Sequence, residues 1–374
     1  MHLVETTKAL DETVASLAGA SRIFLDTEFE SSRQGTQLCL VQLSAGEEAY
    51  VIDALRVRDL TPLRGVLGRD DCEWVFHAGA QDVQLLLEHL ELDAPPHLFD
   101  TQVAWALTGP EYSVSLGYLL YRVLGLRAPK TYQADDWKRR PLPRNQLEYA
   151  AADVEHLPAL RARLVARLSE LGREDAIYEA TRELIWPPLE APAQLGLSSF
   201  RNAWQLDERS QAALRHLLDW YNALDGDQRQ HAPDAKALLS IAKRIPESVE
   251  DLERIKGVPR HFARRNGQAL VSGIVRASDG AVAADFVPIE PPPYATFAEL
   301  RMDAWLGVVR AEACTGARIA PELAFPGRVT KRVRGDLVEQ ADPQPLIDAL
   351  TGWRRDVLYD HVIAACARYR IPRD

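Results

Sequence analysis

The stretch Phe24-Leu-Asp-Thr-Glu-Phe-Glu30 decides how the rest of this sequence is interpreted. It begins as an apolar run with β propensity, and it places Asp26 and Glu28 two residues apart. Alternate side chains of a strand lie on the same face of a sheet, so we expect the two carboxylates to point the same way. Like charges this close repel and raise each other's pKa. Such a pair needs a physical reason, which the remaining motifs supply.

The composition indicates a folded protein with more than one domain. The chain has 374 residues, 47% of them hydrophobic and 26% charged, and this length is too great for one ordinary domain. No apolar run approaches the ~20 residues that span a bilayer, and the first residues carry acids instead of the apolar stretch of a secretory signal. We therefore expect a cytoplasmic, monomeric protein with no membrane partner.

Several common functional signatures are absent from the sequence. The GxGxxG, GxSxG and phosphate-binding GxxxxGKS or GxxxxGKT motifs are missing, which excludes the commonest nucleotide-binding and hydrolase signatures. The cysteines are scattered, without a CxxC pair, which predicts reduced thiols and neither a zinc site nor a disulfide framework. They are Cys39, Cys72, Cys314 and Cys366.

The first part of the chain alternates short β-rich runs with helical patterns. Predicted strands cover residues 23–30, 38–43, 49–53 and 74–77. The first three lie close enough in the sequence to form an antiparallel meander. Predicted helices cover residues 81–89, 101–107, 115–124 and 144–170. Nearly everything beyond has a helical pattern, so we expect an α/β domain with a mixed sheet, followed by all-α segments.

Charge and proline content divide the chain into modules. Residues 1–199 carry 19 basic and 30 acidic side chains, whereas residues 200–280 carry 13 and 11, and residues 296–374 carry 12 and 11. Proline-rich stretches at 186–192 and 286–293 are typical of extended linkers. The expected domains are a catalytic domain at 1–190 and helical domains at 197–280 and 296–374, with a proline-rich linker at 281–295.

Three further side chains fall where they can join Asp26 and Glu28. Asp82 stands at the start of a helix that follows a strand, and Tyr149 and Asp153 are four residues apart, on one face of a helix. Oxygen ligands of this kind suit Mg²⁺ or Mn²⁺, and a pair of such ions is the usual arrangement for in-line attack on a phosphodiester. Taken singly, each feature is common in structural roles, since an Asp at a helix start is usually an N-cap. The combination of all five predicts a metal site.

The order and wording of these motifs resemble the ribonuclease D family, in the branch of the DEDD exonuclease superfamily that has a tyrosine four residues before the last Asp. The matching stretches are FLDTEFE, LVQLS, HAGAQD, FDTQVA, DWKRRPL and EYAAADVEHL, within residues 20–165. The resemblance implies a ribonuclease H-like fold and two divalent metal ions, Mg²⁺ or Mn²⁺. Asp26, Glu28, Asp82 and Asp153 are the implied metal ligands. Tyr149 is the implied catalytic group that orients the attacking water.

Candidate substrate contacts lie near these motifs. For His77 we expect either a role near the substrate phosphate or a packed, hydrogen-bonded histidine. Gln42 and Trp137 are expected to contact a terminal base or sugar, and Lys138 and Arg140 to supply positive charge near an RNA backbone. The family has a similar Asp-Trp-x-x-Arg-Pro-Leu run, whose role does not follow from the residues alone.

The C-terminal half resembles a pair of HRDC domains, small helical modules shared with RecQ helicases. The first has the matching motifs NAWQL, LSIAKRIP and IKG, and the second has IAPEL and LTGWRR but lacks the Ile-Ala run and the Ile-x-Gly turn. Basic clusters at 260–265, which contains Arg264 and Arg265, and at 328–334 indicate binding to nucleic acid. A solvated helix face is the alternative interpretation of either cluster.

These features predict a metal-dependent 3′→5′ exoribonuclease that removes one nucleotide at a time and releases nucleoside 5′-monophosphates. By resemblance, its substrates are RNAs with single-stranded 3′ ends, among them tRNA precursors and other small stable RNAs. A 3′→5′ DNA exonuclease of repair is the closest alternative, because DNA exonucleases share these carboxylates. A non-catalytic RNA-binding adaptor is a further alternative, against which the five intact site residues argue. A chain ending near Pro192 is expected to trim short RNA and to lose affinity for structured RNA.

Overall fold

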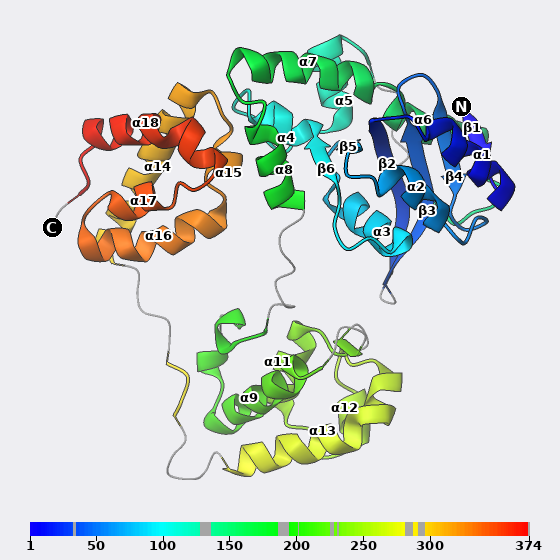
Figure 1. The fold of residues 1–374 in the computed structure, drawn as a ribbon. Coiled ribbons are helices and arrows are strands. Elements are labelled where there is room, and N and C mark those ends of the chain that lie inside the picture. The colour runs from blue at the N-terminus through cyan, green and yellow to red at the C-terminus, as the bar shows by residue number, and fades with distance from the viewer. Residues whose placement is uncertain are drawn as a thin grey trace. The chain divides into compact units, whose positions relative to one another are not determined.

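The computed structural model describes residues 1–32, 35–127, 136–185, 194–200, 202–224, 228–229, 232–280, 287–290 and 296–372. The chain forms two compact units, labelled by their elements in Figure 1. One contains residues 1–30, 36–188 and 295–374, and the other contains residues 31–35 and 189–294. The linker predicted at 186–192 lies outside the described residues, as does most of the linker predicted at 281–295. No helix in the described ranges is long and apolar enough to cross a membrane.

The first unit is built on a six-stranded sheet with the order β1-β4-β3-β2-β5-β6. Its strands are β1 (His2–Val4), β2 (Arg22–Ser32), β3 (Gly35–Ser44), β4 (Ala49–Asp53), β5 (Glu73–Phe76) and β6 (His97–Asp100). Strands β3 and β4 are antiparallel, whereas β2 pairs in parallel with β5, β5 with β6, and β1 with β4. The predicted mixed sheet is confirmed. The short strands β1 and β6 were not predicted, because they lack the aromatic and β-branched run, Trp-Val-Phe, that identified the equally short β5.

Helices cover both faces of this sheet. They are α1 (Thr7–Leu17), α2 (Arg64–Leu67), α3 (Ala80–Leu90), α4 (Thr101–Ala106), α5 (Leu116–Leu119), α6 (Arg144–Glu155), α7 (Leu157–Glu170) and α8 (Ala176–Ile185). A 3₁₀ turn, η1 (Thr61–Leu63), precedes α2, and a π-helical segment, η2 (Leu120–Leu124), continues α5.

The single helix predicted over residues 144–170 is wrong, because the chain breaks at His156 between α6 and α7. Pro158 causes the break: it has no N–H to donate and its ring clashes inside a helix, so it is tolerated only in a first turn. The break lets α6 and α7 take separate directions after the residues of the predicted site.

Strand β2 is buried on both faces before it reaches the acidic residues. Ile23 and Leu25 belong to the core under α1 and α3, whereas Phe24 belongs to the core under α4 and α7. A third apolar cluster joins β3 and β4 to α6 and includes Trp137 and Tyr149. The strand that carries Asp26 is therefore held between helices on both sides, which fixes the positions of its side chains.

The helices after residue 296 belong to this first unit as well. They are α14 (Phe297–Ala317), α15 (Pro321–Ala324), α16 (Gly327–Gln340), α17 (Gln344–Asp348) and α18 (Trp353–Arg368), and they share an apolar core with α4, α7 and α8. The buried guanidinium of Arg173 donates to the backbone oxygens of Leu107 and Ala317, and the N–H of Ala320 donates to Ala106 O at 2.8 Å. These contacts join the predicted second helical domain to the sheet-containing domain.

Beyond residue 194, the described residues of the second unit form helices and turns with their own apolar core. Its longer helices are α9 (Glu208–Asn222), α11 (Ala235–Arg244), α12 (Val249–Glu253) and α13 (Arg260–Gly280), preceded by two 3₁₀ turns, η3 (Leu197–Ser199) and η4 (Ala203–Gln205). Asp207, Asp234 and Ser248 each accept an N–H of the first helical turn as N-caps. The mixed sheet with helices on both faces and the helical region after it agree with the fold that the sequence resemblance implies.

Candidate active site

The structure brings the five predicted catalytic residues around one cavity of about 570 Å³. Asp26 and Glu28 come from β2, Asp82 from the first turn of α3, and Tyr149 and Asp153 from α6. Carboxylate oxygens of Asp26, Glu28 and Asp153 lie within 4.8 Å of one another. The side chains that strand alternation places on β2 and those that the i, i+4 spacing places on α6 therefore lie in the same cavity.

Asp82 lies in the same cavity but outside that close group of three carboxylates. It accepts a hydrogen bond from the Thr27 hydroxyl, and both side chains are buried. Thr27 stands between Asp26 and Glu28 on β2 and lines the same cavity, so β2 also contributes a hydrogen bond that holds Asp82. Thr27 was not predicted as a site residue, since nothing in the sequence indicates that its neighbour across the fold is an acid.

The turn before α3 is held by the carboxylate of Asp100, at the end of β6. Asp100 accepts the backbone N–H groups of Ala78 at 3.1 Å and Gly79 at 3.0 Å, and it caps α4 through Gln102 N at 2.7 Å. Ala78 has a φ of 58°, in the left-handed region, and a Cβ on Gly79 would come within 2.5 Å of Phe76 Cβ. Asp100 therefore stabilises an unusual turn, and that turn determines where Asp82 lies.

His77 uses both ring nitrogens within the protein. Nδ1 lies 2.9 Å from Thr101 Oγ1, and Nε2 lies 3.0 Å from the backbone oxygen of Val114, which also accepts Gln102 Nε2 at 2.9 Å. Burial lowers the pKa of His77, with Asp100 acting in the opposite direction. Of the two expected roles, the packed and hydrogen-bonded histidine fits this geometry. His77 fixes the cavity wall at Val114 instead of offering a free nitrogen to a phosphate.

The carboxylates interact strongly in the absence of a cation. Burial raises the pKa of Asp26 well above its usual range, and Asp82, Asp153 and Glu28 raise it further. Burial, with Asp153 and Asp82, raises the pKa of Glu28 to about 9. Burial raises the pKa of Asp153 to about 7. Burial, together with Asp153, Glu28 and Asp26, raises the pKa of Tyr149 well above 10. Protons partly neutralise this site, and divalent cations can take their place.

The donor set fits a hard divalent cation. All the ligand atoms available from Asp26, Glu28, Asp82 and Asp153 are carboxylate oxygens, which Mg²⁺ and Mn²⁺ prefer. Burial raises the pKa of Asp26, Glu28 and Asp153, and among the described residues no cationic side chain counts among the main influences on them. The family to which these motifs point implies dependence on divalent metal ions, and the acidic cluster for them is in place.

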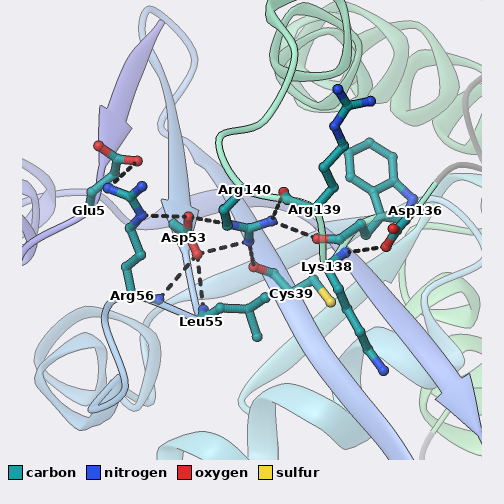
Figure 2. A network of polar contacts seen from close by, with 10 residues as sticks. Glu5, Cys39, Asp53, Leu55, Arg56, Asp136, Lys138, Arg139 and Arg140 are labelled. Carbon is teal, nitrogen blue, oxygen red and sulfur yellow. Dashed lines mark hydrogen bonds and ion pairs between the residues drawn. The ribbon is translucent and has the colours of Figure 1, made fainter.

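Burial contradicts two predicted substrate contacts, Gln42 and Trp137, and an ion pair occupies a third, Arg140. Gln42 has no exposed surface, and its side-chain amide has no hydrogen-bond partner among the described residues. Trp137 is only 1% exposed and packs beside Tyr149, with ring centroids 6.3 Å apart. Arg140 forms an ion pair with buried Asp53 (Figure 2). None of these three side chains is available to a base or a phosphate, whereas Lys138 is exposed and stays a candidate.

The predicted basic clusters differ in what occupies their side chains. Arg264 is exposed and its Nε donates to Glu253 Oε1 at 3.1 Å, and Arg265 is also exposed. In the other cluster, Arg334 forms an ion pair with Asp303 at 2.8 Å. Each cluster thus has one arginine in an ion pair, and Lys331 and Arg332 of the second cluster are exposed like Arg265. Binding of nucleic acid by Arg264 and Arg265 stays a prediction.

Comparison with known proteins identifies relatives over the whole chain. Residues 1–169 match a protein family described as a 3′-5′ exonuclease. The chain is 32% identical to a ribonuclease D of Gluconacetobacter diazotrophicus over 373 residues, 97% of this chain and 92% of that protein. It is 31% identical to ribonuclease D of Escherichia coli over 277 residues, 71% of this chain and 73% of that protein.

A solved structure extends this similarity to the fold. The crystal structure of Escherichia coli RNase D, described as an exoribonuclease involved in structured RNA processing, aligns with a TM-score of 0.74. The sequences are 25% identical in that alignment, which covers 98% of this chain and 99% of the other. The similarity therefore includes the helical region after the exonuclease domain.

Proposed function

The chain belongs to the ribonuclease D family of 3′-5′ exoribonucleases, and from this premise we propose that it hydrolyses single-stranded 3′ ends of RNA and releases nucleoside 5′-monophosphates. The observation that supports this reaction is the close group formed by Asp26, Glu28 and Asp153, whose carboxylate oxygens lie within 4.8 Å of one another beside Tyr149. Such a site has no use in a protein that only binds RNA, so the adaptor alternative is not favoured.

Metal ions are part of the proposal. Asp26, Glu28, Asp82 and Asp153 would hold two Mg²⁺ or Mn²⁺ ions. When bound, such ions lower the pKa of an attacking water and stabilise the leaving oxygen of a phosphodiester. Asp26 would be a ligand close to the other carboxylates, since, in addition to burial, Asp82, Asp153 and Glu28 all raise its pKa.

Tyr149 would orient the attacking water through its hydroxyl. Burial and the surrounding carboxylates raise its pKa well above 10, so the phenol stays protonated at neutral pH. A group that keeps its proton positions a water by hydrogen bonding and does not act as the general base. Trp137 on one side and the carboxylates on the other restrict where the phenol can lie.

The proposed substrates are RNAs with single-stranded 3′ ends, such as tRNA precursors and other small stable RNAs. The exposed side chains of Lys138 and Arg139 extend away from the ion pair of Asp53 and Arg140 (Figure 2), where they can contact a phosphate backbone. Arg264 and Arg265 would bind more distant parts of the RNA. A cytoplasmic location and a monomeric state stay predictions.

Hydrolysis of matched RNA and DNA oligomers tests the proposal against its DNA alternative. Both carry the same sequence and an unpaired 3′ end, and the products are separated after incubation with Mg²⁺ or with a chelator. We expect the RNA to shorten from its 3′ end, with 5′-mononucleotides as products, and the chelator to stop the reaction. Faster hydrolysis of the DNA would favour the repair exonuclease.

A further inference from the structure

The segment from Asp136 to Pro143 leads directly into α6, and Arg140 ties it to the sheet. Its Nε donates to Asp53 Oδ2 at 2.5 Å, and its Nη2 donates to Asp53 Oδ1 at 2.8 Å. Asp53 is the last residue of β4, so the ion pair connects the chain before α6 to the end of a strand (Figure 2). Paired N–H donors on one carboxylate fix direction as well as distance.

The remaining N–H groups of the guanidinium are also occupied. Nη1 donates to the backbone oxygens of Trp137 at 2.7 Å and Arg139 at 2.8 Å, and Nη2 also donates to Cys39 O at 3.2 Å. An arginine side chain has five N–H groups, and Nε, Nη1 and Nη2 of Arg140 together make five hydrogen bonds. No donor is left for a phosphate, so the hydrogen bonding of this side chain is internal.

Asp53 accepts hydrogen bonds from this guanidinium, and its carboxylate has no contact with solvent. Its side chain has no exposed surface, and Oδ1 also accepts the N–H groups of Leu55 at 3.0 Å and Arg56 at 3.2 Å. A buried carboxylate without a cation is strongly destabilising. Arg56 lies 3.8 Å from Asp53 and reaches outward to Glu5, so it is the weaker of the two cationic neighbours.

Both backbone polar groups of Trp137, its N–H and its carbonyl oxygen, form hydrogen bonds to side chains. Its N–H donates to Glu30 Oε1 at 3.1 Å, and its backbone oxygen accepts Nη1 of Arg140 at 2.7 Å. Glu30 lies on β2, two residues beyond Glu28 and on the same face. The indole is buried and lies beside the ring of Tyr149, at a centroid distance of 6.3 Å and an interplanar angle of 30°. The position of the Tyr149 ring therefore depends on the position of Trp137.

We propose that Arg140, paired with Asp53, is a positioning residue for Tyr149 and acts through Trp137. The ion pair fixes the segment before α6 against β3 and β4, and Glu30 fixes it against β2, which carries Asp26 and Glu28. The distance between the phenol and the carboxylates is thereby set by the guanidinium of Arg140. This inference rests on the proposed function, because it assigns Arg140 a part in the hydrolysis that Tyr149 assists.

The substitution Arg140→Lys tests this role while keeping a positive charge for Asp53. An ammonium has three donors and no planar fork, so it cannot hold Asp53 and three backbone oxygens together. We expect kcat for a short RNA oligomer to fall about tenfold, less than the ~10²-fold that a 1 Å misplacement can cost. KM should stay within about twofold of the unsubstituted enzyme.

Arg161→Lys is the matched control. Arg161 donates to Glu73 Oε1 at 2.7 Å, and its side chain is 13% exposed compared with 16% for Arg140. Glu73 lies at the start of β5, away from the carboxylate cavity. We expect this variant to lose stability and to keep its kcat. An equal fall in kcat for both variants would mean a general effect of stability and would overturn the proposal.

A double-mutant cycle with Tyr149→Phe shows whether Arg140 acts through the phenol. If it does, Arg140→Lys should change kcat less than about twofold in the Tyr149→Phe background, because coupled residues are not additive. The same tenfold loss in both backgrounds would overturn the proposal. So would a rise in KM with kcat unchanged, because it would make Arg140 a substrate contact.

A second variant covers the case in which Arg140→Lys does not fold. Trp137→Leu leaves the ion pair in place and removes the ring beside Tyr149, so it should lower kcat in the unsubstituted background and not in the Tyr149→Phe background. Additive losses would contradict the role of Trp137. Failure of the proposed function would look different, because the unsubstituted enzyme would then hydrolyse RNA no faster than its Asp26→Asn variant.

Discussion

Asp100 accepts a hydrogen bond from the backbone N–H of Gly79 at 3.0 Å, and this contact ties the end of β6 to the turn that begins α3. The turn carries a left-handed residue, Ala78, and leads to Asp82 within its first helical turn. Asp100 is buried and accepts backbone N–H groups from the turn before α3 and from α4. Its charge therefore stabilises the backbone of these two segments. An acid outside the set of predicted metal ligands thus determines where one of those ligands lies.

Asp100→Asn should therefore weaken both stability and metal binding. Charge-assisted hydrogen bonds contribute about 2 kcal/mol, so we expect the free energy of unfolding in urea to fall by about that amount. Titration calorimetry should show weaker binding of Mn²⁺, because Asp82 is displaced. Asp59→Asn is the control, since exposed Asp59 also accepts a backbone N–H, from Thr61 at 3.0 Å. Unchanged Mn²⁺ affinity in the Asp100 variant would mean that the turn does not set the position of Asp82.

The metal-free protein should lose stability as pH rises. The pKa of Glu28 is raised from 4.5 to about 9 and that of Asp153 from 3.8 to about 7. Between these limits the folded protein retains protons that the unfolded chain has released, so the free energy of unfolding falls as pH rises. We expect the Tm in EDTA to be lower at pH 8 than at pH 6.

Mn²⁺ should reverse this loss, and more strongly at pH 8, because the metal competes with fewer bound protons there than at pH 6. Thermal unfolding with and without Mn²⁺ at both pH values measures the effect. Glu28→Gln is the informative variant, since it removes one of the titrating groups and should flatten the pH dependence in EDTA. A Tm that does not respond to Mn²⁺ at either pH would argue against a metal site.

Tyr149→Phe should lower kcat by roughly 10²-fold, within the range for a group that positions a reacting water. The phenylalanine ring keeps the contact with Trp137, so the fold and the affinity for RNA should change little. Single-turnover hydrolysis measures the rate, and fluorescence anisotropy of a labelled oligomer measures the affinity. A variant that hydrolyses RNA at the unsubstituted rate would show that another group orients the water.

Replacing both Arg264 and Arg265 by Gln should weaken binding of a structured, tRNA-sized RNA. Each phosphate contact contributes a slope of about −0.7 to the dependence of affinity on salt for single strands, so the salt dependence should also become shallower. The matched control is Arg209→Gln with Arg276→Gln, which removes the same charge near the other end of α13, where Arg209 pairs with Asp279. Equal binding by the two double variants across a salt series would exclude a specific role for the Arg264 cluster.

Local patterns were sufficient to predict the elements that carry the site. Strand alternation placed Asp26 and Glu28 on one face, and helical spacing placed Tyr149 with Asp153, because both depend only on neighbours in the sequence. Exposure is different, since it depends on residues far along the chain. The partner that buries Arg140 is Asp53, which lies 87 positions away, so the apparent basic run gave no sign that one of its members is internal.

The packing of the helices after residue 296 against the sheet-containing domain could not be predicted from the sequence either. Arg173 contacts Ala317 across 144 positions, and Arg354 contacts Glu183 across 171. A chain ending near Pro192 would lose the helices that cover the apolar surface of α4, α7 and α8. The expectation that such a chain keeps trimming RNA stays a prediction, and substitutions on α13 test RNA capture without removing these helices.

The most direct test of the account is the rate at which Asp26→Asn hydrolyses a single-stranded RNA oligomer in the presence of Mg²⁺. Removing one of several mutually repelling carboxylates should leave the metal-free fold intact, which circular dichroism checks. We predict a rate at least about 10³-fold lower than that of the unsubstituted enzyme, because several kcal/mol of metal-dependent stabilisation would be lost. The unsubstituted enzyme should release 5′-mononucleotides from the 3′ end. A folded Asp26→Asn variant whose rate is within about tenfold of the unsubstituted enzyme would contradict hydrolysis at this carboxylate cavity.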